Sequence, residues 1–202
     1  MNIKNVALVA LLAMLIACGR ENQTGQPETD TTGSVQSIQQ TSDTASATTT
    51  GSMGGAVSNM SEDDKEFVSK AGMGGLAEVQ MGNLALQKAA NADVKAFGQR
   101  MVTDHSKANA ELAQFATAKG LALPTELADE HKAGYEHLNG LSGAEFDKAY
   151  MEHMVSDHEK DVAEFDKAST SASDADLKAW AGKTLPTLKE HLELAKTTAR
   201  KV

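Results

Sequence analysis

Four stretches between residues 61 and 199 repeat apolar side chains at steps of three and four residues, the spacing that lines up one face of an α-helix. Each stretch also carries an ionisable side chain near its middle, on that same face: Glu78, His105, His158 and His191. A polar group on the buried face of a helix needs a partner from a neighbouring helix. The pattern therefore predicts an all-α protein, an antiparallel four-helix bundle in which these four side chains approach one another.

One segment of this pattern occurs twice. Residues 101–112 recur imperfectly as residues 154–165, with seven of twelve positions identical. Both copies contain an Asp-His pair, Asp104 with His105 and Asp157 with His158. The repetition predicts two helices that face one another and present their histidines to a shared interior.

Capping and turn signals mark the ends of the helices. A side chain that suits a helix N-cap precedes each long helix: Ser61, Asn91, Ser142 and Ser173. Ser142 is also expected to form a capping box with Glu145. Gly120 suits the position after the C-terminus of the second helix. Residues 125–138 are expected to form a short extra helix between the second and third long ones, with His131 and His137 in solvent. Residues 121–141 either cap one end of the bundle or cross its length, as the long connection of ferritin-like folds does.

The rise of about 1.5 Å per residue tests which polar side chains lie at one level. Glu78 lies about as far before the first turn as His105 lies after it, so these two are expected to meet. If the last turn spans residues 169–173, His158 and His191 differ in level by roughly 10 Å, and His153 matches His191 better. The second pair of residues is therefore left open.

The N-terminus has the features of a bacterial lipoprotein leader. An apolar run at residues 6–16 is too short to span a bilayer, and it ends at Cys18, the single cysteine of the chain. We expect a signal peptide at residues 1–17, with Cys18 lipidated, and a disordered Ser/Thr/Gly-rich tether over residues 18–60, before a folded domain at residues 61–202. No Asp follows Cys18, which favours the outer membrane, facing the periplasm, as the location in the cell envelope.

The charge balance excludes one class of partner. The formal net charge is −9, and so acidic a chain is repelled by phosphate backbones, which argues against nucleic acid. The membrane, reached through Cys18, is the partner that the sequence predicts. No Ser-His-Asp or Cys-His arrangement suited to nucleophilic catalysis is visible, so an enzyme is not the favoured reading.

Three readings of the buried polar residues stay open: a metal site, a hydrogen-bonded layer, and a site for a small organic ligand. Glu78, His105, His158 and His191 can ligate a transition metal such as Zn, Cu, Fe or Mn, since imidazole suits several of these. Acidic and imidazole groups nearby would orient those ligands by hydrogen bonds: Asp104, His153, Asp157 and Asp161. Alternatively, histidine and aspartate form a hydrogen-bonded layer that fixes helix register without any ligand. Five methionines (Met73, Met81, Met101, Met151 and Met154) offer thioethers for Cu(I), although adaptable core filling is their commoner use.

The domain resembles a bacterial family catalogued as domain of unknown function 4142, usually placed among ferritin-like helical bundles. The resemblance rests on residues 67–82, which include Gly-Met-Gly-Gly at 72–75, and on residues 100–105, 143–151, 157–158 and 184–191. It implies a secreted or lipid-anchored envelope protein with a ferritin-like fold. The Glu-x-x-His motif of ferritin-like di-iron sites is missing at both Asp-His pairs, which argues against oxidase or iron-storage chemistry.

These observations lead to three functional hypotheses. The first is a lipid-anchored envelope module for binding or stress protection that holds a metal ion between its helices. The second is a ferritin-like, metal-dependent redox enzyme. The third is a purely structural envelope module with a buried His/Asp layer.

Overall fold

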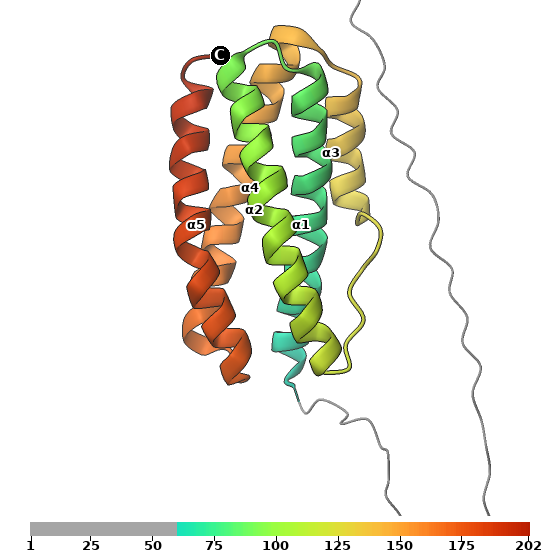
Figure 1. Ribbon diagram of the computed structural model, residues 1–202, viewed down its shortest axis with the longest axis vertical. Helices are drawn as coiled ribbons and strands as arrows, with labels where there is room; N and C mark the ends of the chain where they lie inside the picture. Colours follow the sequence, from blue (N-terminus) through green and yellow to red (C-terminus); the bar gives the residue numbers. More distant parts are fainter. Residues whose placement is uncertain (1–59) are drawn as a thin grey trace, which may run out of the picture. The chain divides into compact units, whose positions relative to one another are not determined.

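The computed structural model describes residues 60–202, and in this range the chain forms five α-helices and no strand (Figure 1). The helices are α1 (Glu62–Lys88), α2 (Ala92–Ala118), α3 (Asp129–Asn139), α4 (Gly143–Ser171) and α5 (Ala175–Ala199). The all-α prediction is confirmed. None of these helices is long and apolar enough to cross a membrane. The expected signal peptide, the lipidated Cys18 and the tether lie outside the described residues.

The helices pack as two hairpins joined side by side. α1 packs against α2, α4 packs against α5, and the hairpins meet through α1 with α4 and α2 with α5. α3 lies against α1 and α4 (Figure 1). At one end Lys119 contacts Asp174, with 2.6 Å between Nζ and Oδ2, and at the other Lys88 donates to the Asn139 carbonyl at 2.7 Å. The connection from α2 to α4 therefore crosses the length of the helices, and it does not cap one end.

The helix ends follow the capping signals in part. Ser61 accepts from the Asp64 amide at 3.1 Å, and Asn91 accepts from the Asp93 amide at 2.8 Å, as expected. The prediction for the last helix was wrong, because Asp174 caps α5 in place of Ser173. Ser142 occupies the N-cap position of α4, but its side chain makes no capping bond. The short helix α3 begins at Asp129, four residues later than expected.

Two buried aspartates lock the hairpins together. The Asp64 carboxylate of α1 accepts from the backbone N–H groups of Ser173 and Asp174, at 3.1 and 2.9 Å, in the turn of the other hairpin. Asp147 of α4 accepts from Ala90 and Asn91, the latter at 2.8 Å, in the turn of the first. Each carboxylate satisfies amides that a helix N-terminus leaves unpaired. These reciprocal hydrogen bonds fix the axial position of one hairpin relative to the other.

A close approach between α1 and α2 sets their register. A Cβ built on Gly82 would lie 2.8 Å from the Gly98 carbonyl oxygen, too close for any side chain. A Cβ on Gly74, by contrast, would meet nothing within 4 Å. Gly82 therefore allows the close approach of the two helices, whereas Gly74 has room for a side chain. Gly82 lies one turn from Glu78, so its contact also places Glu78 relative to α2.

The apolar core is divided by a polar layer. One cluster lies between the polar layer and the α1–α2 turn and contains Met81, Phe97, Met101, Met151 and Met154, all at most 1 % exposed. The other apolar clusters lie towards the α4–α5 turn, around Val68, Leu112 and Phe165. Four of the five methionines fill the core, as the commoner use predicted. The layer between the clusters contains the ionisable side chains of the four stripes.

Candidate metal centre

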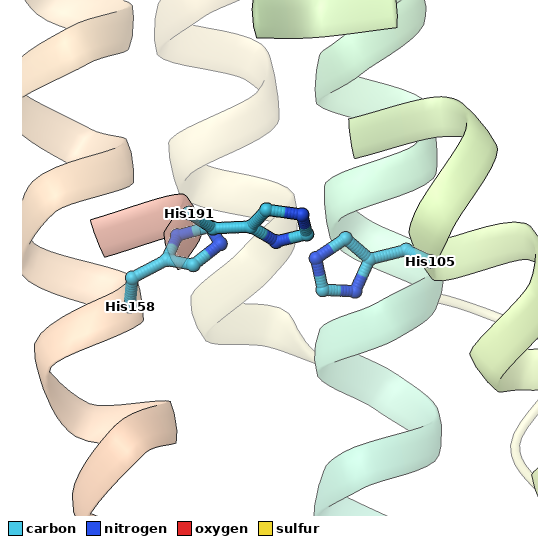
Figure 2. Close-up of side chains that lie close together, drawn as sticks. All are labelled: His105, His158 and His191. Carbon is cyan, nitrogen blue, oxygen red and sulfur yellow. The ribbon is translucent and has the colours of Figure 1, made fainter. Parts of the chain in front are cut away.

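Four buried ionisable side chains meet between the apolar clusters, one from each long helix. Glu78 comes from α1, His105 from α2, His158 from α4 and His191 from α5, with exposed fractions of 2, 6, 0 and 1 %. Figure 2 shows the three imidazole rings pointing toward one another. Their ring centroids are 5.3 to 5.8 Å apart. The helical periodicity therefore brought together the four side chains that it singled out.

The level argument failed for the second pair, and the helix boundary explains why. α4 continues to Ser171, so the turn is shorter and lies later than residues 169–173. This moves His158 to within about one helical turn of His191 in level, and the two ring centroids are 5.4 Å apart. His153 does not join them. Within residues 60–202, the group whose ligand atoms come within 4.8 Å of one another consists of His105, His158 and His191.

Each of the three histidines has one ring nitrogen held by an acceptor. His105 Nδ1 lies 2.8 Å from Glu78 Oε2, His158 Nδ1 lies 2.9 Å from the Met154 carbonyl oxygen, and His191 Nε2 lies 2.8 Å from Asp104 Oδ2. Carbonyl and carboxylate oxygens only accept, so each of these nitrogens carries the hydrogen when the ring is neutral. The tautomers are thereby fixed by the surroundings of the site.

The opposite nitrogen of each ring is buried and has no hydrogen-bond partner in the described residues. These are His105 Nε2, His158 Nε2 and His191 Nδ1, and Glu78 Oε1 is unpartnered as well. Glu78 Oε1 lies 3.3 Å from His158 Nε2, but the two are not aligned as a hydrogen bond. In the neutral tautomers, three nitrogen lone pairs and a carboxylate oxygen thus face a shared interior. Buried polar atoms normally find partners, so this arrangement needs a ligand or a proton.

The charges of the layer shift its ionisation. Burial raises the pKa of Glu78, but His105 and His158 outweigh it and bring that pKa down to about 2. Burial lowers the pKa of His191 to about 4, although the hydrogen bond to Asp104 acts in the other direction. Glu78 is therefore ionised and His191 neutral at pH 7. This is the state in which both ligate a cation.

The four residues expected to support the ligands take different places. Asp104 reaches from α2 across to His191 on α5, where it orients that ring as expected. Asp157 instead stays on its own helix, with Oδ2 3.1 Å from His153 Nε2. Asp161 lies beside Glu78 without a hydrogen bond or ion pair in the described range. Burial, together with the charges of Glu78 and Asp157, raises the pKa of Asp161 well above its usual range.

Other contacts of the site were not foreseen. Arg100 lies 3.2 Å from Asp104 and 2.9 Å from Glu190, and its spacing of four residues from Asp104 was the signal for the first contact. The contact of the Met154 carbonyl with His158 could not be foreseen, because a backbone carbonyl leaves no signature in the sequence. His131 was expected in solvent, but its side chain is only 18 % exposed and lines a cleft beside Glu78. His137 is exposed, as expected.

The fold and the site together define an all-helical protein with a buried histidine cluster. The chain belongs to the family described as "Domain of unknown function (DUF4142)", whose model matches residues 49–198. The resemblance seen in the sequence is thus confirmed. No curated protein matches this chain in sequence.

Two solved structures share the fold. One is a DUF305 fragment from Deinococcus radiodurans, with a TM-score of 0.63 and 10% identity over 71% of this chain and 99% of that one. The other is described as "CopM in the Cu(II)-bound form", with a TM-score of 0.58 and 14% identity over 68% of this chain and 96% of that one. At such identities the likeness concerns the fold alone.

Proposed function

We propose that this protein binds a divalent transition metal ion between His105, His158 and His191, with Glu78 as an oxygen ligand. The observation that carries the proposal is the pairing of ring nitrogens. Each histidine has one nitrogen fixed by an acceptor, and the other is buried and unpartnered. Metal-ligating histidines are built in this way, with the second ring N–H donated to a carboxylate or a backbone carbonyl.

The donor set indicates which metals would fit. Three neutral imidazoles with one carboxylate suit zinc and copper, and among divalent ions such a nitrogen-rich site binds Cu²⁺ most tightly. CopM, a structural neighbour, was solved in a Cu(II)-bound form, which is consistent with copper in a related fold. The buried methionines pack in the apolar cluster and are not needed as ligands. We therefore expect Cu²⁺ to bind most tightly and Zn²⁺ next.

A structural layer without metal is the second candidate. Two contacts cross between helices, His191 with Asp104 and His105 with Glu78, and these would fix helix register by themselves. A layer selected for register alone, however, would also satisfy the inward-facing nitrogens. Leaving a buried polar group unpaired costs about 1–3 kcal/mol each. This cost favours the reading in which a cation occupies the interior.

The test is metal binding by the purified, tag-free protein. We expect one Cu²⁺ or Zn²⁺ per chain, a higher melting temperature with metal than with chelator, and loss of both effects in His105→Gln and His158→Gln. His137→Gln is the matched control, because it removes an exposed histidine from α3 and should bind like the wild type. A wild-type protein that takes up no metal and melts unchanged with Cu, Zn, Fe and Mn would leave the structural layer as the explanation.

We further propose that the five helices are a ferritin-like four-helix bundle with α3 on its crossover, and that Cys18 anchors this domain to the outer membrane. The long connection supports the first point, and the leader-like sequence before Cys18 supports the second. In that setting the domain would sequester metal as stress protection in the periplasm. Labelling of cells with a radioactive fatty acid should mark the wild type and not Cys18→Ser; equal labelling would refute the anchor.

A further inference from the structure

A cleft beside the histidines opens between α1, α3 and α4. Its volume is about 280 Å³. Exposed side chains such as Glu130 and Lys160 line its mouth, and the buried Glu78 lies at its inner end. His131, His153, Asp157 and Asp161 line the walls between them. The cleft thus runs from solvent to a ligand of the proposed metal site.

A second, smaller cavity continues from this inner end. It measures about 30 Å³, and its lining includes His105, Asn109 and Thr184. Glu78 and Asp161 line both this cavity and the cleft, so the two spaces share these carboxylates as a common wall. His105 Nε2, one of the unpartnered nitrogens, belongs to a residue of the smaller cavity. An ion that passes Glu78 and Asp161 is therefore already beside His105.

The cleft is negatively charged. Five carboxylates line it (Glu78, Glu130, Asp157, Asp161 and Glu164) against two lysines. Lys70 pairs with Glu66 at 2.8 Å and lies 4.0 Å from Glu164, and Lys160 lies 3.6 Å from Asp157. Neither lysine has an ion pair with Asp161 or Glu78. A concave surface of one charge sign raises the local concentration of cations and speeds their association.

The inner end of the cleft offers ligands as well as charge. Glu78 is 2 % exposed and its Oε1 has no partner, so a buried acceptor faces the space. Asp161 is equally without a hydrogen bond or ion pair in the described residues, so its carboxylate is a second unpaired oxygen donor at this end. Oxygen ligands of this kind hold transition metals less tightly than three imidazoles do. An ion captured here would move on to the histidines.

We propose that this cleft is the route by which the metal ion reaches the histidines, and that Asp157 and Asp161 form a weak cation subsite at its inner end. Glu78 connects the two places, because its carboxylate borders the cleft and contacts both His105 and His158. The inference rests on the proposed metal site. It adds that uptake and release of the ion depend on residues that contribute little to its final binding.

The experiment separates rate from affinity. Stopped-flow uptake of Cu²⁺ from a weak chromophoric chelator is compared among the wild type, the double variant Asp157→Asn/Asp161→Asn and the double control Glu159→Gln/Asp166→Asn. The control removes the same charge from exposed positions of the same helix, outside the cleft, so general attraction of the ion is matched. We expect about tenfold slower uptake in the test variant than in the control. Release slows in proportion, and stoichiometry and dissociation constant stay within about twofold.

Each other outcome contradicts the inference in a distinct way. Equal uptake rates in the test variant and the control would show that the ion enters elsewhere. Loss of stoichiometric metal in the test variant would make Asp157 and Asp161 ligands of the final site and not a subsite on the way. A wild-type protein that binds no metal at equilibrium would refute the proposed function itself, and the access route with it.

Discussion

Acid should destabilise the metal-free protein through His191. Burial holds the pKa of this histidine at about 4, against an ordinary value of 6.5. In the unfolded chain it takes up a proton below about pH 6.5, but the folded protein admits one only near pH 4. The unfolded state therefore binds more protons between these values, and stability falls as the pH falls through that window.

The size of the effect follows from the shift. A fall from 6.5 to about 4 in pKa corresponds to ~3 kcal/mol at 1.36 kcal/mol per unit. This stability is fully present above pH 6.5, and most of it is lost by pH 4.5. Asp161 works in the opposite direction, since its raised pKa favours the folded state as the pH falls. A comparison with a variant is therefore needed to isolate His191.

The contribution of His191 is isolated by comparing the wild type with His191→Gln. Both proteins are unfolded in urea at pH 7.5 and 4.5, with chelator present, and unfolding is followed by circular dichroism. Glutamine stays neutral and keeps a donor for Asp104. We expect the wild type to lose ~2–3 kcal/mol more than the variant between the two pH values. If the two proteins lose the same amount, the imidazole of His191 does not titrate as its burial requires, and the reasoning is refuted.

Three further changes test the packing and the charges. Gly82→Ala should lower the free energy of unfolding in urea by about 1–3 kcal/mol, because its Cβ meets the Gly98 carbonyl. The control Gly74→Ala should be neutral or stabilising, and equal effects of the two changes would contradict the close approach. Asp161→Asn should stabilise the metal-free protein at pH 7.5, where burial and its acidic neighbours make the charged form costly, and less so at pH 4.5; a lower urea midpoint at pH 7.5 would count against this. Asp147→Ala should cost about 1.5–3 kcal/mol in urea and speed hydrogen exchange of the α1–α2 turn amides, and unchanged exchange would exclude its capping role.

Helical periodicity and capping residues were enough to predict the helices and the buried face of each. The period of the stripes placed Glu78 and the three histidines inside, and the caps at Ser61 and Asn91 were correct. The last turn was misplaced chiefly because α4 continues to Ser171, and also because Asp174 caps α5 where Ser173 was an equally good candidate. That small error produced a false mismatch of His158 with His191 and gave His153 undue weight.

Contacts between distant residues had no local signal. The partner of Asp147 lies in a turn more than fifty residues earlier, and the partners of Asp64 lie more than a hundred residues later. The route of residues 119–142 depends on these contacts, since helix lengths alone allowed two topologies. The cleft depends on α3, whose placement against α1 and α4 brings His131 next to the acidic residues.

The repeat seen in the sequence is not the repeat of the structure. The sequence equates α2 with α4, through Asp104-His105 and Asp157-His158. The structure instead makes α1 correspond to α4, because Asp64 of α1 and Asp147 of α4 each bind the turn of the other hairpin.

This second correspondence extends to the site. Glu78 follows Asp64 by 14 residues, and Asp161 follows Asp147 by 14 residues, so the two carboxylates occupy equivalent places on α1 and α4. Both therefore face the interior between the hairpins, where they share a wall of the cleft and of the cavity beside His105. The histidines lower the pKa of Glu78, whereas burial and the neighbouring carboxylates raise the pKa of Asp161. A cation bound at the inner end of the cleft would supply the positive charge that Asp161 lacks.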